Sequence, residues 1–470
     1  MLEKIVSFVN DIVWSPALVV LLVGAGIYFT IRTRFVQLRR IGLMARLLFR
    51  KREKGSEKKG VSSFEAFCIA LSGRVGTGNI VGVATAIALG GPGAIFWMWI
   101  IAFFGASTAF VESTLAQKYK FSHETGFRGG PACYIEKGLK SKWLAITFAV
   151  ITIFACGMLL TTVQANGMAT AAQNSFGISP LASGLFLATV LGLVVIGGVK
   201  RVAKAASLVT PFMAIVYIII AFVVLAINWR AIPGLLSCIV ENAVGINPLC
   251  GGILGSTIMM GVKRGLFSNE AGQGTGAIPS ASADVKHPAE QGLVQAFSVY
   301  VDTLLVCTAT ALMILSAGTF NILDSSTGEM LLANSPELGA NYVGFTQAAV
   351  DSVFGGFGST FVSIALTFFV FTTIMAYYFD SESSLMYLCS MDGKVSRRTE
   401  NILIRVFQVV QLSAVVFGAV KEANLVWTLG DIGVGIMAWV NVVAIIILSG
   451  KAFKALREYE KDYLPRFQKK

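Results

Sequence analysis

Charged residues are scarce in this chain of 470 residues: Asp, Glu, Lys and Arg together make up only 14% of it. Ordinary soluble domains carry about 25%. Hydrophobic residues account for 55%, and the mean hydropathy is +0.72. This balance excludes a soluble globular domain and indicates a polytopic membrane protein. The length leaves room for roughly a dozen spanning helices of about 20 residues each.

Histidine and paired cysteine are also scarce, which argues against a metal or redox centre. The only histidines are His123 and His287. None of the seven cysteines belongs to a C-x-x-C pair and most lie in apolar runs, so we expect small core residues without a disulfide framework. No G-x-x-x-x-G-K-[ST] pattern occurs, which argues against ATP drive, and no nucleophile–base spacing points to an enzyme.

Acidic residues are outnumbered by basic ones, 26 against 38, and the net charge is +12. The basic residues collect in short loops between apolar runs, which is the topology signal of the positive-inside rule. The expected partner is therefore the lipid bilayer and not nucleic acid. The N-terminus lacks the features of a signal peptide, so the first apolar run is expected to stay in the membrane.

Eleven membrane-spanning segments are expected from the apolar runs. An amphipathic connector at 228–248 and a long loop at 317–356 separate some of them. The segments are 16–31, 62–89, 94–119, 143–172, 181–199, 203–227, a region that starts with 249–260, 292–316, 359–388, 400–420 and 426–449.

Loop charges give the orientation. Every second loop is basic, starting with 32–59, whereas 317–356 contains no Lys or Arg. The N-terminus is therefore expected outside and the C-terminus inside, which agrees with an odd number of crossings. The predicted location is the cytoplasmic membrane, with a multi-pass chain.

A glycine-rich stretch interrupts the second segment near its middle: Leu71-Ser72-Gly73-Arg74-Val75-Gly76-Thr77-Gly78-Asn79-Ile80. A charge at the bilayer centre costs at least about 2.5 kcal/mol, and glycine weakens a helix by about 1 kcal/mol. Irregular backbone at this depth persists only where it is buried or lines a wet cavity. Many secondary transporters hold a solute at such a break, although glycines in a kinked helix would also serve close packing.

A second interrupted segment follows five helices later, where 249–260 is too short to span and runs into a polar, glycine-rich tract. Two breaks at matching positions predict an inverted repeat of five plus five helices, preceded by one extra helix. The predicted parts are 1–60 for the extra helix and a basic loop, 61–230 for the first repeat, 231–450 for a connector and the second repeat, and 451–470 for a basic tail.

Several blocks resemble a known family. Gly90-Gly91-Pro92-Gly93-Ala94-Ile95-Phe96-Trp97-Met98-Trp99-Ile100 looks like the signature of the sodium:alanine (alanine/glycine:cation) symporter family. The stretches 71–80, 129–131, 163–166, 261–272 and 302–303 also resemble family blocks. The resemblance covers roughly 62–450 and implies an all-α membrane protein of the LeuT-type fold. It also implies cation-driven uptake of small neutral amino acids.

An amino-acid zwitterion needs N–H donors for its carboxylate, and the start of a half-helix supplies them. We therefore assign the carboxylate to the amides of Thr77 and Gly78. Asn79 would offer its side-chain carbonyl to the substrate or the ion, or else cap the outer half-helix. Gln164, a polar residue in an apolar helix, would contact the substrate or another helix.

Sodium requires about five or six oxygen ligands. The carbonyls of Ser72 and Val75, freed at the break, are one source. The hydroxyls of Thr372 and Thr373 are the expected partners, since similar folds join these two helices through such a site. The alternative for both threonines is a hydrogen bond to the carbonyl four residues earlier.

At the second break, Phe267 would form a wall of the side-chain pocket. Backbone groups here, with Ser268 and Asn269 in the expected substrate site, would accept the substrate ammonium. Glu270 is expected to pair with Arg74 or with Lys263 and Arg264. Glu112 and Asp302 are expected to hold helices in place. Tyr377 stands where family members usually carry Trp, which would change the size and polarity of the pocket.

The predicted function is Na⁺-coupled symport of a small neutral amino acid into the cell by alternating access. The chain is expected to act as a monomer. One alternative is H⁺ coupling, with Glu270, Glu112 or Asp302 as the titrating group, and another is a larger substrate such as glutamine. A channel or a sensor on a transporter scaffold is the alternative from a different class.

Overall fold

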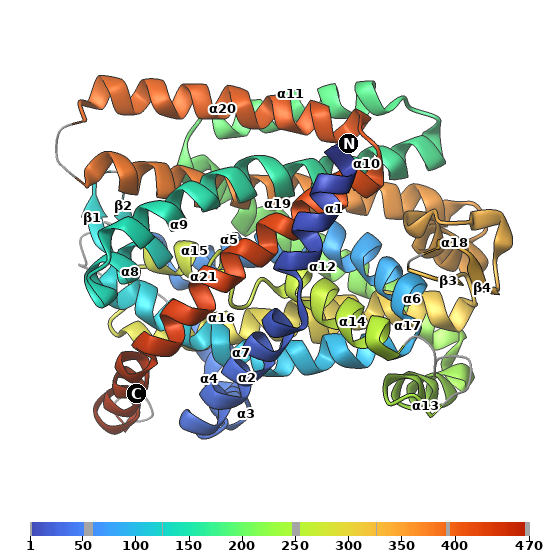
Figure 1. Ribbon diagram of the computed structural model, residues 1–470, viewed down its shortest axis with the longest axis horizontal. Helices are drawn as coiled ribbons and strands as arrows, with labels where there is room; N and C mark the ends of the chain where they lie inside the picture. Colours follow the sequence, from blue (N-terminus) through green and yellow to red (C-terminus); the bar gives the residue numbers. More distant parts are fainter. Residues whose placement is uncertain are drawn as a thin grey trace.

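The computed structural model describes residues 2–50, 60–124, 126–246, 254–325, 327–391 and 395–465. It is a helical bundle in which long helices such as α19 and α20 run along the longest axis (Figure 1). The α-helices in chain order are α1 Leu2–Val13, α2 Pro16–Arg32, α3 Val36–Arg39, α4 Ile41–Leu48, α5 Ser63–Arg74, α6 Val83–Gly90, α7 Gly93–Tyr119, α8 Pro131–Leu139, α9 Lys142–Phe154, α10 Thr161–Phe176, α11 Pro180–Val195, α12 Val199–Ile227, α13 Ile232–Ala243, α14 Leu254–Asn269, α15 Ala277–Ser282, α16 Pro288–Val299, α17 Thr308–Ala317, α18 Tyr342–Phe354, α19 Phe357–Ser390, α20 Arg397–Val420 and α21 Ala423–Glu458. Wider π turns form η1 Gly78–Gly82, η2 Ala155–Leu160, η4 Tyr300–Cys307 and η6 Tyr459–Tyr463, and short 3-10 turns form η3 Trp229–Ala231 and η5 Pro336–Leu338.

Among the described residues, eight helices are long and apolar enough to cross a membrane. The pair Ser63–Arg74 and Gly78–Gly90, bent by 50°, makes a ninth if it is counted as one span. Helix α11 is apolar but shorter. The number eleven and the orientation of the termini therefore stay predictions. The expected start of the seventh segment at 249–253 and the basic residues 51–59 lie outside the described residues.

The seventh segment forms a longer helix than expected. We predicted that it would break off after Met260, whereas α14 continues to Asn269. Its glycines serve close packing, because a Cβ on Gly261 or Gly265 would lie 2.4 or 2.3 Å from a side-chain atom of α7. The second break therefore begins at Glu270.

The predicted loop at 317–356 is structured, and the chain is not purely helical. Strands β3 (Asn321–Leu323) and β4 (Met330–Ala333) pair antiparallel, and α18 follows them. Strands β1 (Phe121–His123) and β2 (Gly126–Arg128) form a second antiparallel pair at the opposite end of the bundle (Figure 1). Both hairpins lie outside the long apolar helices, so they do not alter the architecture of the spanning region.

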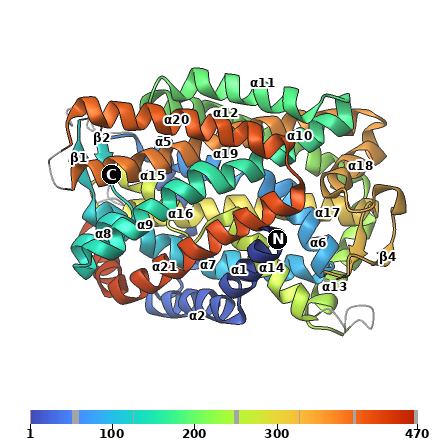
Figure 2. The ribbon, with the colours of Figure 1, turned by 45° about the horizontal axis from the view of Figure 1, so that its top comes forward.

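The two interrupted segments pack against each other inside the bundle. Helix α5 contacts α15, and η1 and α6 contact α14. Three further pairs that lie five segments apart also pack together, namely α7 with α16, α10 with α19 and α11 with α20, and Figure 2 shows the last pair along one side of the bundle. Side-chain packing thus places both breaks in the buried centre.

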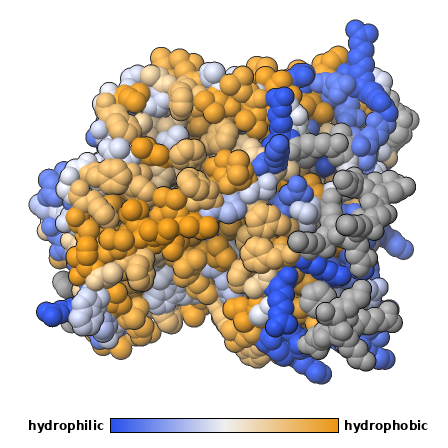
Figure 3. Space-filling view, turned by 180° about the vertical axis from the view of Figure 1, so that it is seen from behind, coloured by the Kyte–Doolittle hydropathy of each residue, from blue (hydrophilic) through white to orange (hydrophobic). Residues whose placement is uncertain are grey.

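The outer surface fits a lipid environment. One face of the molecule is broadly apolar, with hydrophilic residues gathered toward one edge of the view (Figure 3). Large apolar side chains are exposed along the spanning helices, for example Leu208, Phe212 and Phe222 on α12. Exposing such a surface to water would be unfavourable, because each Å² of exposed apolar surface costs about 25 cal/mol of transfer free energy.

Candidate functional site

The first break lies between α5 and η1, at residues 75–77. Helix α5 starts with a capping box between Ser62 and Glu65 and ends at Arg74. Beyond the break, the side-chain oxygen of Asn79 accepts a hydrogen bond of 2.8 Å from the N–H of Gly76. This bond ties the backbone of the break to η1, whereas Thr77 at the N-cap of η1 makes no side-chain capping hydrogen bond, so the capping role expected for Asn79 is not seen.

The amide of Thr77 already has a partner inside the protein. Gln164 on α10 accepts a hydrogen bond of 2.9 Å from the Thr77 N–H through Oε1. We expected this amide to receive a substrate carboxylate, so the expectation does not describe the conformation seen here. Gly76 makes the contact possible, because a Cβ there would lie 2.6 Å from Oε1 of Gln164 and from Oγ1 of Thr373.

Thr373 on α19 faces the carbonyl groups at the end of α5. Its Oγ1 lies 2.8 Å from the carbonyl oxygen of Ser72 and 3.2 Å from that of Val75. It also lies 2.8 Å from the carbonyl oxygen of Phe369, four residues earlier on its own helix. One hydroxyl proton cannot serve three acceptors well, so these oxygens form a cluster with more acceptors than donors.

Thr372 does not belong to this cluster. Its Oγ1 lies 3.1 and 3.0 Å from the carbonyl oxygens of Phe368 and Phe369 and 3.5 Å from the sulfur of Met213 on α12. Successive residues of an α-helix point about 100° apart, so two adjacent threonines cannot face the same carbonyls. The predicted cation role of Thr372 is therefore wrong for this arrangement.

The residues before the second break divide into two groups. A Cβ on Gly78 would lie 3.2 Å from the ring of Phe267 and 3.3 Å from the Cα of Ser268, so both border the first break. Asn269 instead builds the second break, since its side-chain oxygen accepts from the N–H of Ala271 at 3.0 Å. Glu270 follows with a left-handed φ of 57°, which ends the helix.

Asp302 on η4 is the centre of a polar cluster that we did not predict at the break. It accepts hydrogen bonds from Asn79 Nδ2 at 2.6 Å and from Ser268 Oγ at 2.9 Å. A third comes from Thr303 Oγ1 at 2.7 Å. A carboxylate inside an apolar segment was the available signal, but only the packing of η4 on η1 and α14 brings it here.

Arg74 supports the second break from within the core. Its Nε donates to the carbonyl oxygen of Asn269 at 2.7 Å, and Nη1 donates to Gln295 and Ser298 on α16. A cation at the end of α14 is favoured by the helix dipole. These described partners are neutral, so the expected ion pair with Glu270 is not formed. Glu270 accepts instead from Thr275 Oγ1 at 2.9 Å.

The other two basic residues expected to pair with Glu270 bind a carboxylate on α21. Lys263 Nζ and Arg264 Nη2 lie 2.8 and 2.5 Å from Oδ2 of Asp431. All three side chains are buried. Arg264 also lies over the rings of Phe267 and Trp427, 5.6 and 4.9 Å from their centroids. This ion-pair group joins α14 to α21.

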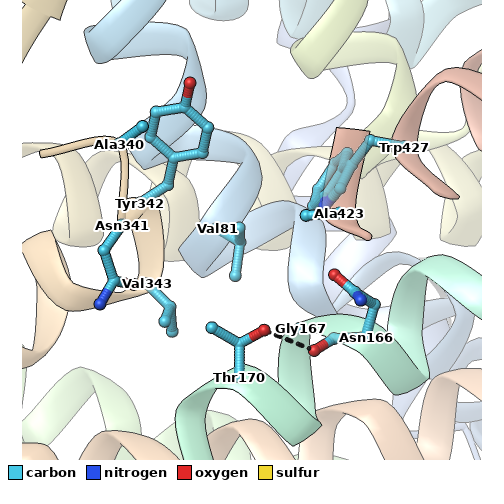
Figure 4. A pocket seen from close by; sticks show the side chains of 10 residues that line it. All are labelled: Val81, Asn166, Gly167, Thr170, Ala340, Asn341, Tyr342, Val343, Ala423 and Trp427. Atoms are coloured by element: carbon cyan, nitrogen blue, oxygen red, sulfur yellow. Dashed lines mark hydrogen bonds between the residues drawn. The ribbon is translucent and has the colours of Figure 1, made fainter. Parts of the chain in front are cut away.

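A cavity of about 340 Å³ lies on the far side of Phe267 from the break. Trp427 lines it and packs against Phe267, with ring centroids 5.1 Å apart and the ring planes tilted by 33°. Val81 of η1 projects toward its centre between Trp427 and Tyr342 (Figure 4). Phe267 thus lies between Trp427, which lines the cavity, and Gly78 at the break, whose residues are buried.

Tyr377 is fully buried one turn along α19 from Thr373. Its hydroxyl group interacts with Glu270, Cys156 and Asp380, so its surroundings are partly polar. The hydrogen-bonded neighbours of the first break come from Gln164, Thr373 and Asp302.

Comparisons with known proteins show the family and the fold of the chain. A model of the sodium:alanine symporter family matches residues 1–469. The sodium/proton-dependent alanine carrier protein of Bacillus sp. (strain PS3) is 47% identical over 409 residues, which are 87% of this chain and 90% of that protein. The protein named "Probable sodium/glutamine symporter GlnT" in Bacillus subtilis (strain 168) is 43% identical over 461 residues, 98% of this chain and 91% of that one.

The crystal structure of MhsT in complex with L-phenylalanine has the same fold. The TM-score is 0.56 at 12% sequence identity, and the match covers 85% of this chain and 98% of that chain. This confirms the LeuT-type fold that the resemblance implied. With the family model across the whole length and relatives named as carriers and symporters, the chain is a membrane transporter and not an enzyme, and it belongs to the sodium:alanine symporter family.

Proposed function

We propose that this protein couples the entry of Na⁺ to the uptake of a small neutral amino acid by alternating access. The observation that carries the proposal is the position of Thr373 Oγ1, 2.8 Å from the carbonyl oxygen of Ser72 and 3.2 Å from that of Val75. Three oxygens from two helices converge on one point at the end of α5.

This oxygen cluster has the chemistry that Na⁺ prefers. Hard cations bind carbonyl and hydroxyl oxygens, and the C-terminal end of a helix carries partial negative charge. Ser72 and Val75 supply the carbonyls and Thr373 the hydroxyl. A bound Na⁺ would tie α19 to the inner half of the broken helix, so that cation binding and the angle of the break depend on each other.

The Thr77 amide and Gln164 suit the carboxylate of an amino acid. In the present conformation Gln164 Oε1 accepts a hydrogen bond from the Thr77 N–H. A substrate carboxylate is a stronger acceptor than an amide oxygen and would replace it, leaving the Gln164 amide to donate to the substrate. The Gly78 amide would complete the carboxylate site. Phe267 would cover the side chain, and Asp302 with Ser268 would provide negative potential for the ammonium group.

Alternating access requires a barrier on each side of the break. On the side of the cavity of Figure 4, the barrier is Phe267 beneath Trp427, held by the ion pair of Arg264 and Asp431. On the other side, Arg74 joins the end of α14 to α16. We infer that one set of contacts opens at a time, which a rigid bundle with one flexible helix pair allows.

The packing of equivalent segments supports the finer topology that we propose. Four of the five pairs in a five-plus-five repeat are in contact: α5–α6 with α14–α15, α7 with α16, α10 with α19, and α11 with α20. We infer eleven crossings of the cytoplasmic membrane, with the N-terminus outside and the C-terminus inside, and a monomeric transport unit.

H⁺ coupling is the second candidate, because buried carboxylates near the break have oxygens without a hydrogen-bond partner among the described residues. Within the described part of the chain, Oε1 of Glu270 and Oε1 of Glu112 have no hydrogen-bond partner. The name of the alanine carrier from strain PS3 includes the proton. For the substrate, the name of the Bacillus subtilis relative makes glutamine the alternative to alanine or glycine.

Uptake into liposomes tests both the coupling ion and the identity of the substrate. We expect purified protein to accumulate labelled alanine when Na⁺ is higher outside, and to accumulate none with equal Na⁺ on both sides and an inward pH gradient. Excess glycine should compete and excess glutamine should not. Accumulation that follows the pH gradient without Na⁺ would establish H⁺ coupling instead. If glutamine competes and glycine does not, glutamine replaces alanine as the proposed substrate.

A further inference from the structure

A second cavity lies at the end of the bundle to which the positive-inside rule assigns the cytoplasm. It measures about 370 Å³ and lies between the end of α2, the end of α3 and the end of α21 with the following turn η6. Figure 1 places these elements together near the C-terminus of the chain. Its lining comprises four arginines, one acid, one threonine and three apolar residues, namely Arg32, Arg34, Arg39, Arg457, Glu460, Thr33, Ile31, Phe453 and Leu456.

From this cavity we propose a binding site for an anionic phospholipid, with the phosphate of its headgroup among the arginines. The proposal is independent of the transported solute, and its failure would leave the proposed transport function untouched. Arginine suits this ligand because its planar guanidinium donates in pairs to phosphate oxygens. Basic pockets between spanning helices on the cytoplasmic side bind anionic headgroups by this chemistry.

Among the described residues, the arginines that line the cavity outnumber the acids. Glu460 accepts from Arg39 at 2.6 Å and from Arg40 at 3.0 Å, which uses the one acid that lines the cavity. Arg34 and Arg457 have no side-chain hydrogen bond or ion pair to any residue that the structure describes. Two exposed guanidinium groups thus remain for an anion.

A tight turn after α2 brings the arginines to the same cavity. Helix α2 ends at Arg32, and the next turn contains Arg34 and Phe35 with left-handed φ values of 56° and 55°. Such values cost energy in non-glycine residues and persist where the surroundings hold them. The turn reverses the chain so that Arg34 and Arg39 line the same cavity, while Arg32 lies over the ring of Phe453 at 5.5 Å.

A lipid fits better than a free phosphate ion because the cavity continues into apolar surface. Ile31 lines the cavity and is exposed, and Ile27 and Val20 are exposed further along α2. On α21, Ile447 and Val443 are exposed as well. Acyl chains attached to a bound headgroup would lie along these two helices, which adds buried apolar area that inorganic phosphate cannot supply.

The test is thermal unfolding of the full chain in a neutral detergent, titrated with phosphatidylglycerol or with phosphatidylcholine of the same acyl chains. We expect phosphatidylglycerol to raise the unfolding midpoint saturably and phosphatidylcholine to give no saturable rise. In the double variant Arg34→Gln, Arg457→Gln the half-saturating concentration should increase by about 10- to 30-fold, since two cation–phosphate attractions are lost.

The matched control is Lys204→Gln, Arg398→Gln, which removes two exposed charges near the starts of α12 and α20, at ends predicted on the same side. It should leave the half-saturating concentration unchanged. The variant Glu460→Gln provides a test in the opposite direction, because it frees Arg39 and Arg40 and should tighten phosphatidylglycerol binding. It also decides the question if the double variant fails to fold.

Three results would overturn the proposal. One is equal stabilisation by both lipids, and another is an unchanged titration in both Arg34→Gln, Arg457→Gln and Glu460→Gln. The third is a full rise in midpoint with inorganic phosphate alone, to which phosphatidylglycerol adds nothing. That result would assign the arginines to a soluble anion.

Discussion

Replacing Thr373 by Ala is expected to weaken Na⁺ activation of uptake by about 10- to 150-fold. In the part of the chain that the structure describes, this hydroxyl is the side-chain oxygen that contacts the carbonyls of both Ser72 and Val75. Hydrogen-bonding or ligand contacts to charged groups contribute about 1.5–3 kcal/mol, which corresponds to this range of affinity. Initial rates of alanine uptake into liposomes, measured against external Na⁺, report the change as a shift in half-saturating Na⁺.

Thr372→Ala is the matched control. It removes the same hydroxyl from the adjacent residue, which faces Met213 and its own helix instead of α5. We expect its half-saturating Na⁺ to equal that of the wild type. Thr373→Ser keeps the hydroxyl and should restore most of the lost affinity. Equal losses in Thr372→Ala and Thr373→Ala would show that the two threonines act through helix α19 and not through a cation.

Replacing Arg74 by Met is expected to destabilise the fold by about 3–5 kcal/mol, the usual cost of removing one partner from a buried charged network. Arg74 makes no ion pair with an acid among the described residues, but it attracts the buried carboxyl groups of Glu270, Glu112, Asp302 and Asp380 electrostatically. Met would leave these acids without it, and would leave the carbonyl of Asn269 without its donor. Denaturant titration in detergent measures the loss.

Arg230→Met controls for the loss of an arginine as such. Arg230 is exposed after α12 and lies over the ring of Trp229. Its replacement should change the free energy of unfolding by no more than about 0.5 kcal/mol. Arg74→Lys keeps the charge but not the planar donors, so we expect an intermediate stability. An Arg74→Met variant as stable as the wild type would mean that the buried acids are neutral in the folded protein.

The spanning segments and the first break could be predicted because both depend on local sequence. Apolar runs mark helices, and glycines with an arginine at mid-membrane mark an interruption. The same local reasoning was wrong at 261–269, where Gly261 and Gly265 are equally glycine-rich but lie inside α14. Only the close approach of α7 distinguishes packing glycines from a break.

The contacts of the site could not be predicted, because they depend on which helices meet. The Thr77 amide binds Gln164, and Asp302 gathers Asn79 and Ser268, through pairs of segments far apart in the sequence. Adjacent residues of one helix also point in different directions, which is why Thr373 reaches the end of α5 and Thr372 does not. Asp431, the partner of Lys263 and Arg264, carries no sequence signal beyond being an acid in an apolar segment.

The claim that Na⁺ and the amino acid bind together at the first break is tested most directly by equilibrium binding to the purified protein. If the sites are coupled, Na⁺ must tighten alanine binding and alanine must tighten Na⁺ binding by the same factor. We predict a common factor of about 5 to 150 in the wild type, and a factor close to one in Thr373→Ala. Alanine binding of equal strength with and without Na⁺ in the wild type would contradict the account.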